Sequence, residues 1–353
     1  MKKLRVNLKE NSYDILIEKK LFQNLGQLLR EKIPSQKVAL ITDENLNSIY
    51  GRELKEILES SGYEARIIVI EPGEKSKNLG TLEMVYGELC KFKMTRSDLI
   101  VTFGGGVVGD LGGFAAATYL RGIPYIQVPT SLLSQIDSSV GGKVAIDLPY
   151  GKNLVGNFYQ PKAVFIDPEL LKTLKHEFLV DGMGEVIKTG CIKSSSLVEK
   201  LSKYNGYEEL LENIEDIIYE CCYIKKMVVE IDERDTGERM KLNFGHTIGH
   251  AIEKYFNYEN YTHGAAVAIG LVEITRKSED MGITKKGTAK VLERLLSAYE
   301  LPYEMPEMDR KEVIKAVTLD KKNIKETLNL ILIRDFGDCI IKKVKIEEIE
   351  DYI

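Results

Sequence analysis

The sequence has few of the side chains that most often bind metals, with five cysteines and four histidines among 353 residues. No two cysteines have CxxC spacing, which argues against a disulfide framework or a thiolate metal site and favours reduced, mostly buried thiols. No run approaches the roughly 20 apolar residues that span a bilayer. The N-terminus alternates polar and apolar side chains and has no apolar core of the kind found in secretion signals. We therefore expect a cytoplasmic protein without a membrane segment.

An excess of positive charge is also absent. The chain has 49 Lys and Arg against 54 Asp and Glu, and its formal net charge is -5. This balance argues against a broad basic surface for DNA or RNA, although it permits a local basic pocket. Neither a nucleic acid nor a membrane is an expected partner.

Two regions of different character follow one another along the chain. Residues 1–168 alternate short apolar strands with helix-length segments, which predicts a mostly parallel sheet covered by helices on both faces. Residues 169–353 favour helices and return to strand only at 328–333 and 339–344. We expect an N-terminal α/β domain, 1–168, and a mainly α-helical C-terminal domain, 169–353. The expected strands of the first domain are 4–8, 13–17, 37–41, 66–70, 99–103 and 125–128, and the expected helices of the second are 169–203, 208–231, 240–256, 264–281, 285–299 and 310–322.

A glycine-rich turn, GGGVVGD at 104–110, follows one of these strands and opens a helix. Without Cβ atoms the backbone can approach a pyrophosphate, and the helix N-terminus offers unpaired N–H groups. The usual Rossmann order is not met, because Arg121 is the only charged residue between Asp110 and Asp137, where an acid for the ribose is expected about 20 residues on. The turn therefore predicts a dinucleotide bound in a non-Rossmann order. The alternative is a glycine-rich helix that simply packs closely on the sheet.

Three of the four histidines fall within eighteen residues: His246, His250 and His263. Imidazole is the commonest metal ligand and the usual proton carrier near neutral pH. Arg239 and Asn243 precede them at helical spacing, so a continuous helix would align these side chains on one face. Thr262 is a plausible N-cap for a helix that begins at His263. Spacing alone suggests His246 and His250 as joint metal ligands with an acid such as Glu185, whereas the alternative is that the histidines only pack or decorate a helix.

Several isolated cations suggest a local anion site. Arg121 stands alone in an uncharged segment, Lys143 and Lys152 lie in loop-like stretches beside glycines, and Lys188 and Lys225 lie in apparent helices. Separated cations of this kind suit a small substrate that carries both phosphate and carboxylate. Taken singly, each of them is better explained as an ordinary surface charge, and so is the charged run at 320–323.

Seven motifs occur in one order along the chain: EPGEKSK (71–77), GGGVVGDLGGFAAATYLRG (104–122), QVPTSLLSQIDSSVGGKVAID (127–147), GKNLVGNFYQPKAV (151–164), GEVIKTG (184–190), DERD (232–235) and LNFGHTIGHAIE (242–253). In this order and spacing they resemble the 3-dehydroquinate synthase family, a branch of the sugar phosphate cyclases, over nearly the whole chain. The resemblance implies a lyase of the shikimate pathway that converts 3-deoxy-D-arabino-heptulosonate 7-phosphate to 3-dehydroquinate and phosphate. The implied steps are transient oxidation by NAD, β-elimination of phosphate, re-reduction, ring opening and intramolecular aldol closure.

The resemblance also implies roles for particular residues. Glu185, His246 and His263 would bind Zn2+, with Co2+ as an alternative ion, and this moves His250 from the metal to the substrate. The residues implied for NAD are Asp43, Glu74, Lys77, Gly105, Gly106, Asp110, Thr130, Ser131, Lys152, Asn153 and Thr173. Those implied for the substrate are Asp137, Lys143, Lys188, Lys225, Arg239, Asn243, His250 and Lys321 (or its neighbour Lys322), with Arg121 reaching the phosphate across the interface of a homodimer.

The sequence leaves other functions open. Some residues beside matched positions depart from the commoner family residues, which bears on affinity more than on reaction type. They are Ser131, Val144, Asn157 and Ala265.

One rival function is that of an NAD- and metal-dependent polyol dehydrogenase of the glycerol dehydrogenase type. Another is a related cyclase such as 2-deoxy-scyllo-inosose synthase, and the third is a non-catalytic zinc protein.

Overall fold

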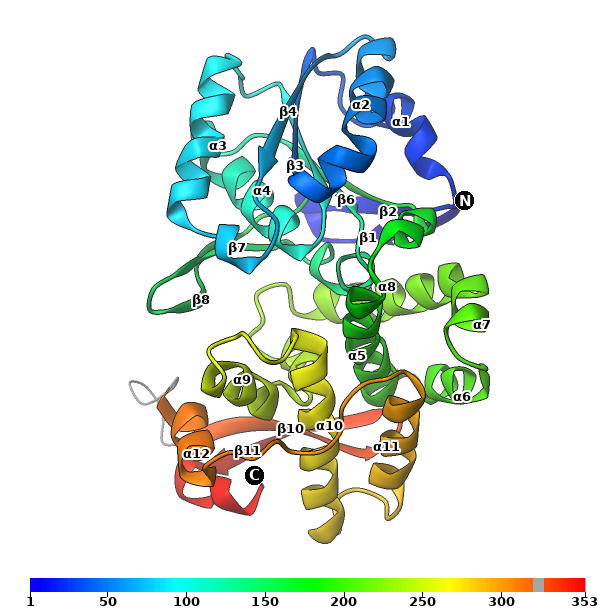
Figure 1. The fold of residues 1–353 in the computed structure, drawn as a ribbon, viewed down its shortest axis with the longest axis vertical. Helices are drawn as coiled ribbons and strands as arrows, with labels where there is room; N and C mark the ends of the chain where they lie inside the picture. Colours follow the sequence, from blue (N-terminus) through cyan, green and yellow to red (C-terminus); the bar gives the residue numbers. More distant parts are fainter. Residues whose placement is uncertain (320–326, 353) are drawn as a thin grey trace. The chain divides into compact units, whose positions relative to one another are not determined.

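The computed structural model describes residues 1–319 and 327–352. They form two compact units, drawn in Figure 1 with colours that follow the chain. The first unit contains Met1–Leu174 and Lys225–Glu233, and the second contains Lys175–Ile224 and the described residues within Arg234–Ile353. Among the described residues, every helix is too short or too polar to cross a membrane.

A seven-stranded sheet forms the centre of the first unit, with the strand order β1-β2-β9-β6-β5-β3-β4. All neighbouring strands pair in parallel except β1 and β2, which form the antiparallel hairpin expected at the N-terminus. Six of the strands fall where the apolar segments predict them, and the short β9 is an addition. The strands are β1 (Lys2–Val6), β2 (Tyr13–Ile17), β3 (Lys37–Asp43), β4 (Glu64–Ile70), β5 (Leu99–Gly104), β6 (Tyr125–Pro129) and β9 (Ala163–Ile166).

The sheet has a switch point between β3 and β5. From β3 the chain moves outward to β4, then crosses back to β5 and continues in the other direction to β6 and β9. In open α/β sheets ligands bind outside the carboxyl ends of the strands at such a reversal. Here those two ends carry Asp43 and Gly104. The order is not that of a Rossmann sheet, in agreement with the expectation from the missing acid.

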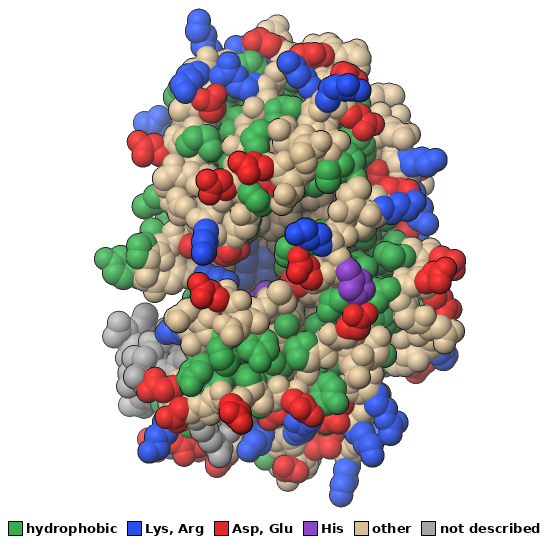
Figure 2. Space-filling model, in the orientation of Figure 1, with side chains coloured by type: hydrophobic (Ala, Val, Ile, Leu, Met, Phe, Trp, Pro, Cys, Tyr) green, Lys and Arg blue, Asp and Glu red, His purple; other side chains and the backbone are tan. Residues whose placement is uncertain are grey.

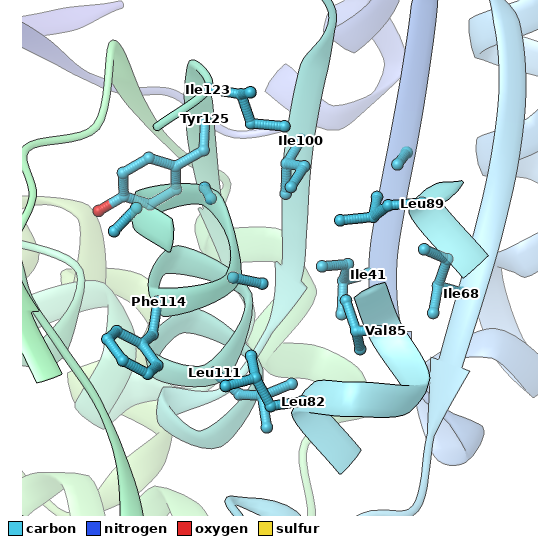
Figure 3. Packing of buried hydrophobic residues seen from close by; sticks show 14 of the residues in the cluster. Ile41, Ile68, Leu82, Val85, Leu89, Ile100, Leu111, Phe114, Ile123 and Tyr125 are labelled. Atoms are coloured by element: carbon cyan, nitrogen blue, oxygen red, sulfur yellow. The ribbon is translucent and has the colours of Figure 1, made fainter. Parts of the chain in front are cut away.

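Helices cover both faces of this sheet, and the strands alternate between two cores (Figure 1). Along β3, Ala39 and Ile41 face one core while Val38 and Leu40 face the other, because successive side chains of a strand point to opposite faces. Figure 3 shows the first core, where side chains of α3 and α4 pack on the sheet. The α-helices that lie wholly in this unit are α1 (Leu25–Lys32), α2 (Glu44–Ser60), α3 (Leu79–Lys91) and α4 (Gly106–Thr118).

A separate hairpin of two antiparallel strands, β7 (Lys143–Leu148) and β8 (Gly151–Phe158), follows β6. Loops were expected around Lys143 and at 151–153, and this expectation was wrong. The alternation in β7 buries Val144 and Ile146 in the first core, and the strand packs on α4. The glycines that suggested loops instead stand before β7 and at the first position of β8.

The second unit is mainly helical, with one antiparallel hairpin formed by β10 and β11 where the two C-terminal strands were expected. The predicted fold class, an α/β N-terminal domain with a mostly parallel sheet and a mainly α-helical C-terminal domain, is confirmed. Figure 2 shows basic and acidic side chains interspersed on the visible face of both units. The remaining elements are α5 (His176–Lys193), α6 (Ser195–Lys203), α7 (Tyr207–Glu212), α8 (Ile214–Ile231), α9 (His246–Tyr255), α10 (His263–Asp280), α11 (Thr288–Ala298), α12 (Arg310–Leu319), β10 (Thr327–Asp335) and β11 (Asp338–Lys345).

Candidate active site

The glycine-rich turn lies at the switch point of the sheet. Strand β5 ends at Gly104, and α4 begins at Gly106 with Gly105 as its N-cap. A Cβ atom at Gly105 or Gly106 would lie 3.5 or 3.4 Å from the hydroxyl of Ser131 or Ser138, which is close to ordinary contact. Packing within the chain therefore does not demand glycine at these two positions. What glycine leaves open there is the approach of a ligand to the exposed N–H groups of the helix N-terminus, which fits a pyrophosphate.

A buried lysine near this turn forms ion pairs with several acidic side chains. Lys77 Nζ lies 2.8 Å from Glu74 Oε1, 3.4 Å from Asp110 Oδ2 and 3.9 Å from Asp147 Oδ1. Asp147 in turn accepts a hydrogen bond of 2.7 Å from the backbone N–H of Asn153 on β8. The structure thus joins the EPGEKSK segment, the N-terminal half of α4 and the β7–β8 hairpin into one polar cluster. Five residues separated by up to 79 positions in the sequence share it, and four of them were expected to bind NAD.

The protonation of this cluster follows from burial and from Lys77. Burial raises the pKa of Asp110 to about 6, although Lys77 acts in the opposite direction. Burial also acts to raise the pKa of Glu74, but Lys77 outweighs it and holds that pKa below the ordinary value. Burial would lower the pKa of Lys77, yet Asp110 and Glu74 raise it, so the lysine is a permanent cation. Such a cation flanked by acids can hold hydroxyl groups and phosphate oxygens of a nucleotide in fixed positions.

Two further residues expected to bind NAD lie at α2. Asp43 at the end of β3 caps α2 by accepting a hydrogen bond of 3.0 Å from the N–H of Leu46. Thr173 Oγ1 lies 3.0 Å from the hydroxyl of Tyr50 on the same helix. The Tyr50 ring in turn contacts Phe103, which precedes the glycine turn on β5. Thr130 donates its N–H to the carbonyl of Gly104, and so it also lies beside the turn.

The first unit also contains residues expected at the substrate. Lys225 Nζ lies 2.7 Å from Asp137 Oδ1 and also donates to the Asp137 carbonyl oxygen. Lys143 lies six residues beyond Asp137, exposed at the start of β7. Arg121 is not brought to this group: it is exposed and follows the far end of α4, which begins at the glycine turn and is about 20 Å long.

Three side chains of the second unit converge as a metal site would require. Glu185 of α5, His246 at the start of α9 and His263 at the start of α10 offer ligand atoms that all lie within 4.8 Å of one another. His246 Nε2 is 3.6 Å and His263 Nε2 is 3.8 Å from Glu185 Oε1. Glu185 is 1% exposed, and its Oε1 atom has no hydrogen-bond partner among the described residues. A buried carboxylate oxygen is costly unless something compensates it, so this donor set fits a divalent cation.

Lys188 holds the other oxygen of the same carboxylate. Its Nζ pairs with Glu185 Oε2 one turn along α5, and its side chain is 2% exposed. Burial lowers the pKa of His246 well below its usual value, and the charge of Lys188 lowers it further. A neutral imidazole is the form that binds metals. Burial would also lower the pKa of His263, but the carboxylates of Glu253 and Glu185 raise it above the ordinary value.

The expected polar stripe on one continuous helix was wrong in part. Arg239 and Asn243 lie on a 3-10 helix, Glu238–Asn243, whereas His246 and His250 lie on α9. The break occurs at Gly245, whose positive φ of +78° separates the 3-10 helix from α9. Arg239 is buried, and Asn243 and His250 are exposed. Lys321 and Lys322, expected near the substrate, lie outside the described residues.

Three acidic residues beside the candidate side chains of the two units were not expected from the sequence. Besides Asp147, Glu253 lies 3.5 Å from His263 Nδ1, and Asp181 of α5 accepts a hydrogen bond of 2.6 Å from the N–H of Gly264. Thr262 is the N-cap residue of α10, as expected, but its side chain makes no capping hydrogen bond, and Asp181 supplies one instead. Glu253 follows His250 by three residues, so helical spacing could have indicated it. Nothing in the sequence indicates Asp181, which is 83 residues from its partner.

The fold defines the class of protein. It is shared with a 2-deoxy-scyllo-inosose synthase complexed with carbaglucose-6-phosphate, NAD+ and Co2+, with a TM-score of 0.88 at 23% identity over 100% of each chain. It is also shared with a 2-epi-5-epi-valiolone synthase from Streptomyces hygroscopicus with NAD+ and Zn2+ bound, with a TM-score of 0.87 at 24% identity over 98% of this chain and 96% of that one. The chain therefore has the fold of the sugar phosphate cyclases.

Sequence comparison gives the family within this class. Residues 67–181 match the family described as 3-dehydroquinate synthase N-terminal, and residues 182–323 match 3-dehydroquinate synthase C-terminal. The 3-dehydroquinate synthase of Clostridium acetobutylicum is 54% identical over 100% of this chain and 99% of its own length. That of Clostridium perfringens is 55% identical over 99% of this chain and 100% of its own. The chain belongs to the 3-dehydroquinate synthase family.

Proposed function

We propose that the protein is an NAD- and metal-dependent lyase that converts 3-deoxy-D-arabino-heptulosonate 7-phosphate to 3-dehydroquinate and phosphate. The observation that carries this proposal is the buried Oε1 atom of Glu185, which faces two imidazole nitrogens while Lys188 holds Oε2. Membership of the family and the full-length identity to its curated members support the same reaction. When bound, NAD takes a hydride and returns it, and the divalent ion polarises the hydroxyl group that is oxidised.

Glu185, His246 and His263 would hold the divalent ion, with zinc as the proposed metal and cobalt as its substitute. Two imidazoles and one carboxylate are a common catalytic zinc set, since they leave coordination positions for a substrate. Solved cyclases of the same fold are complexed with Co2+ or Zn2+, which supports a divalent ion in this role.

The proposed NAD site uses the switch point of the sheet. Its glycine turn would receive the pyrophosphate, and the cluster around Lys77 would hold the ribose and nicotinamide end. NAD+ in the two solved cyclases supports this assignment. The residues we assign to NAD are Asp43, Glu74, Lys77, Gly105, Gly106, Asp110, Thr130, Ser131, Lys152, Asn153 and Thr173.

The remaining polar residues would bind the substrate and steady its charge. Cations matter most at elimination, when negative charge collects on the leaving phosphate. His250, exposed one turn from His246, is the proposed proton carrier. The substrate residues are Asp137, Lys143, Lys188, Lys225, Arg239, Asn243, His250 and Lys321. Because Arg121 follows the end of α4 remote from the glycine turn, we assign it to the phosphate of a partner subunit in a homodimer; the dimer and a cytoplasmic location stay predictions.

The test is to supply the heptulosonate phosphate with trace NAD and zinc, and to measure released phosphate and NADH together. We expect many phosphates per NAD without lasting absorbance from NADH, because the oxidation is reversed in each turnover. Accumulation of NADH in proportion to product, without phosphate, would instead identify a polyol dehydrogenase. Turnover of glucose 6-phosphate, but not of the heptulosonate phosphate, would identify a cyclase for a substrate without a carboxylate. The buried Arg239 favours the carboxylated substrate.

A further inference from the structure

The two ring nitrogens of His263 face two different carboxylates. Nε2 is 3.8 Å from Glu185 Oε1, and Nδ1 is 3.5 Å from Glu253 Oε1. Only one nitrogen of a neutral imidazole has a free lone pair, and the hydrogen bond made by the other decides which one it is. The ring is therefore placed so that a proton on Nδ1 points to Glu253, which leaves Nε2 for a ligand beside Glu185.

We propose that Glu253 is a positioning residue for the metal: its carboxylate accepts the Nδ1 proton of His263 and so fixes Nε2 as the metal ligand. The inference rests on the metal site of the proposed function and adds a residue to it. Glu253 lies on α9, two turns after His246, so α9 supplies one ligand and the group that orients another from α10. The Glu253 side chain is 4% exposed, and His263 Nδ1 lies within reach of its charge.

His246 provides an internal comparison. Its Nδ1 atom lies 3.1 Å from the carbonyl oxygen of Phe244, so it too presents Nε2 towards Glu185. The two imidazoles thus share an orientation but differ in the partner behind them, a neutral carbonyl for His246 and a carboxylate for His263. A carboxylate behind a metal-bound histidine makes it a stronger donor than a carbonyl does.

The negative charge of Glu253 also offsets the buried positive charge of Lys188. Lys188 places a buried cation on Glu185, the single acid among the three proposed ligands. A positive charge next to a carboxylate ligand weakens the attraction of that ligand for a divalent ion. Glu253 restores a negative charge on the other side of His263. Its effect should therefore appear in metal affinity, and not only in ring orientation.

A different role for Glu253 is that of a ligand. His250, Glu253 and His263 also offer atoms within 4.8 Å of one another. His263 belongs to both sets, and in this second set its Nδ1 atom would have to lose its proton. The Nε2 atom of the same ring already faces the buried oxygen of Glu185, which has no hydrogen-bond partner among the described side chains. We therefore assign the ion to the first set and the proton contact to Glu253.

The test compares Glu253→Gln, Glu253→Asp, Glu185→Gln and, as a matched control, Glu273→Gln in the full-length chain. Glu273 lies on α10 and pairs with Arg276, which keeps Glu293 as a second partner. Zinc affinity is measured by competition with a coloured chelator, and the visible spectrum and stoichiometry are measured with Co2+. We expect Glu253→Gln to bind zinc about 10–100-fold more weakly, with a shifted Co2+ spectrum, since the amide keeps a hydrogen bond but not the charge. Glu253→Asp should lie in between, and Glu273→Gln should match the parent protein.

The outcomes separate the inference from the site on which it rests. If Glu185→Gln abolishes binding while Glu253→Gln and Glu253→Asp both bind zinc as the parent does, the positioning role is wrong. If the parent protein binds two Co2+ ions and Glu253→Gln binds one, Glu253 is a ligand and the inference is overturned. Retention of parental zinc affinity in Glu185→Gln would instead contradict the proposed ligand set. Thermal unfolding of each metal-free variant shows whether it folds. If Glu253→Gln does not fold, Glu253→Asp provides the test of the positioning role.

Discussion

The rings of His246 and His250 lie 5.3 Å apart on successive turns of α9 and are nearly perpendicular, at 84°. His246 directs Nε2 to the buried carboxylate of Glu185, whereas His250 is exposed. Two histidines at a spacing that suits a shared ion therefore have different surroundings. This difference is the physical basis for assigning one to the metal and the other to the substrate.

The two histidines should accordingly be separable by mutation. We expect His246→Ala to lose bound zinc, because the site then keeps only one imidazole. His250→Ala should keep zinc and lose turnover by about 100-fold or more, the usual range for a lost proton carrier. Zinc content after gel filtration and phosphate release under saturating NAD measure the two effects. Loss of zinc from His250→Ala would show that the histidine pair binds the ion jointly.

We expect the ionised carboxylate of Asp110 to lower the free energy of unfolding, although it contributes to ligand binding. Its pKa is raised from the ordinary 3.8 to about 6 in the fold, first by burial, so its ionisation opposes folding as pH rises from about 4 through 6. Asp110→Asn removes that cost, and Lys77 keeps Glu74 as a partner. We expect the variant to be more stable than the parent by about 2 kcal/mol above pH 6 and to match it near pH 4.

The same substitution should weaken NAD binding by about tenfold, because one charged contact to the nucleotide is lost. Urea unfolding without NAD at pH 4, 6 and 8, together with NAD titration by fluorescence, measures both effects. A variant that is less stable than the parent at pH 8 would contradict the assigned cost of the carboxylate.

The sequence predicted the fold well where burial repeats with a clear period. The strands of the central sheet are near-continuous apolar runs because both faces are covered, and all six predicted ones occur. The β7–β8 hairpin was missed because the stretches around Lys143 and at 151–153 were expected to be loops, although β7 itself alternates buried Val144 and Ile146 with more exposed neighbours. The glycines at Gly141, Gly142 and Gly151 favour a loop more strongly than this short alternation favours a strand.

The candidate site was predictable in its residues more than in its geometry. Motif spacing brought out His246, His250 and His263, but it could not show that Gly245 breaks the helix before them. The direction of a histidine ring depends on what lies behind it. Helical spacing places Glu253 one turn after His250, but it does not show that the carboxylate lies beside His263 on another helix. Contacts between distant segments, such as that of Asp181 with Gly264, cannot be predicted from a local sequence pattern.

We expect the ion pairs of Asp14 to stabilise the fold at neutral pH and to lose this effect in acid. The carboxyl group is buried in β2 within 3.2 Å of cations on Lys3, Arg5 and Lys32. Burial alone would raise the pKa of Asp14, but the hydrogen bonds from Lys32, Arg5 and Lys3 lower it from 3.8 to about 2. The stabilisation is thus complete above about pH 4 and is lost as pH falls towards 2.

We expect Asp14→Asn to unfold more easily at pH 7 by about 1 kcal/mol, a figure reduced for the solvent around the three cations. The difference from the parent should shrink between pH 4 and pH 2. The control is Glu18→Gln, which removes a surface pair with the N-terminus and should change stability little. Thermal unfolding across this pH range is the measurement, and a difference that does not depend on pH would contradict the assignment.

Gly264, next to His263, packs against the backbone of Asp181 with no room for a methyl group. A Cβ atom at Gly264 would lie 1.9 Å from the Asp181 carbonyl oxygen, which belongs to the backbone of α5 and cannot move aside. Gly264→Ala should therefore push α10 away from α5, cost about 3 kcal/mol of stability and separate His263 from Glu185. Gly87→Ala on α3 is the matched control, since a Cβ there meets no atom within 4 Å, and alanine should stabilise that helix by up to about 1 kcal/mol. Urea unfolding of the metal-free variants and their zinc affinity test both effects: a Gly264→Ala protein that binds zinc as the parent does would show that the two ligands do not depend on this contact.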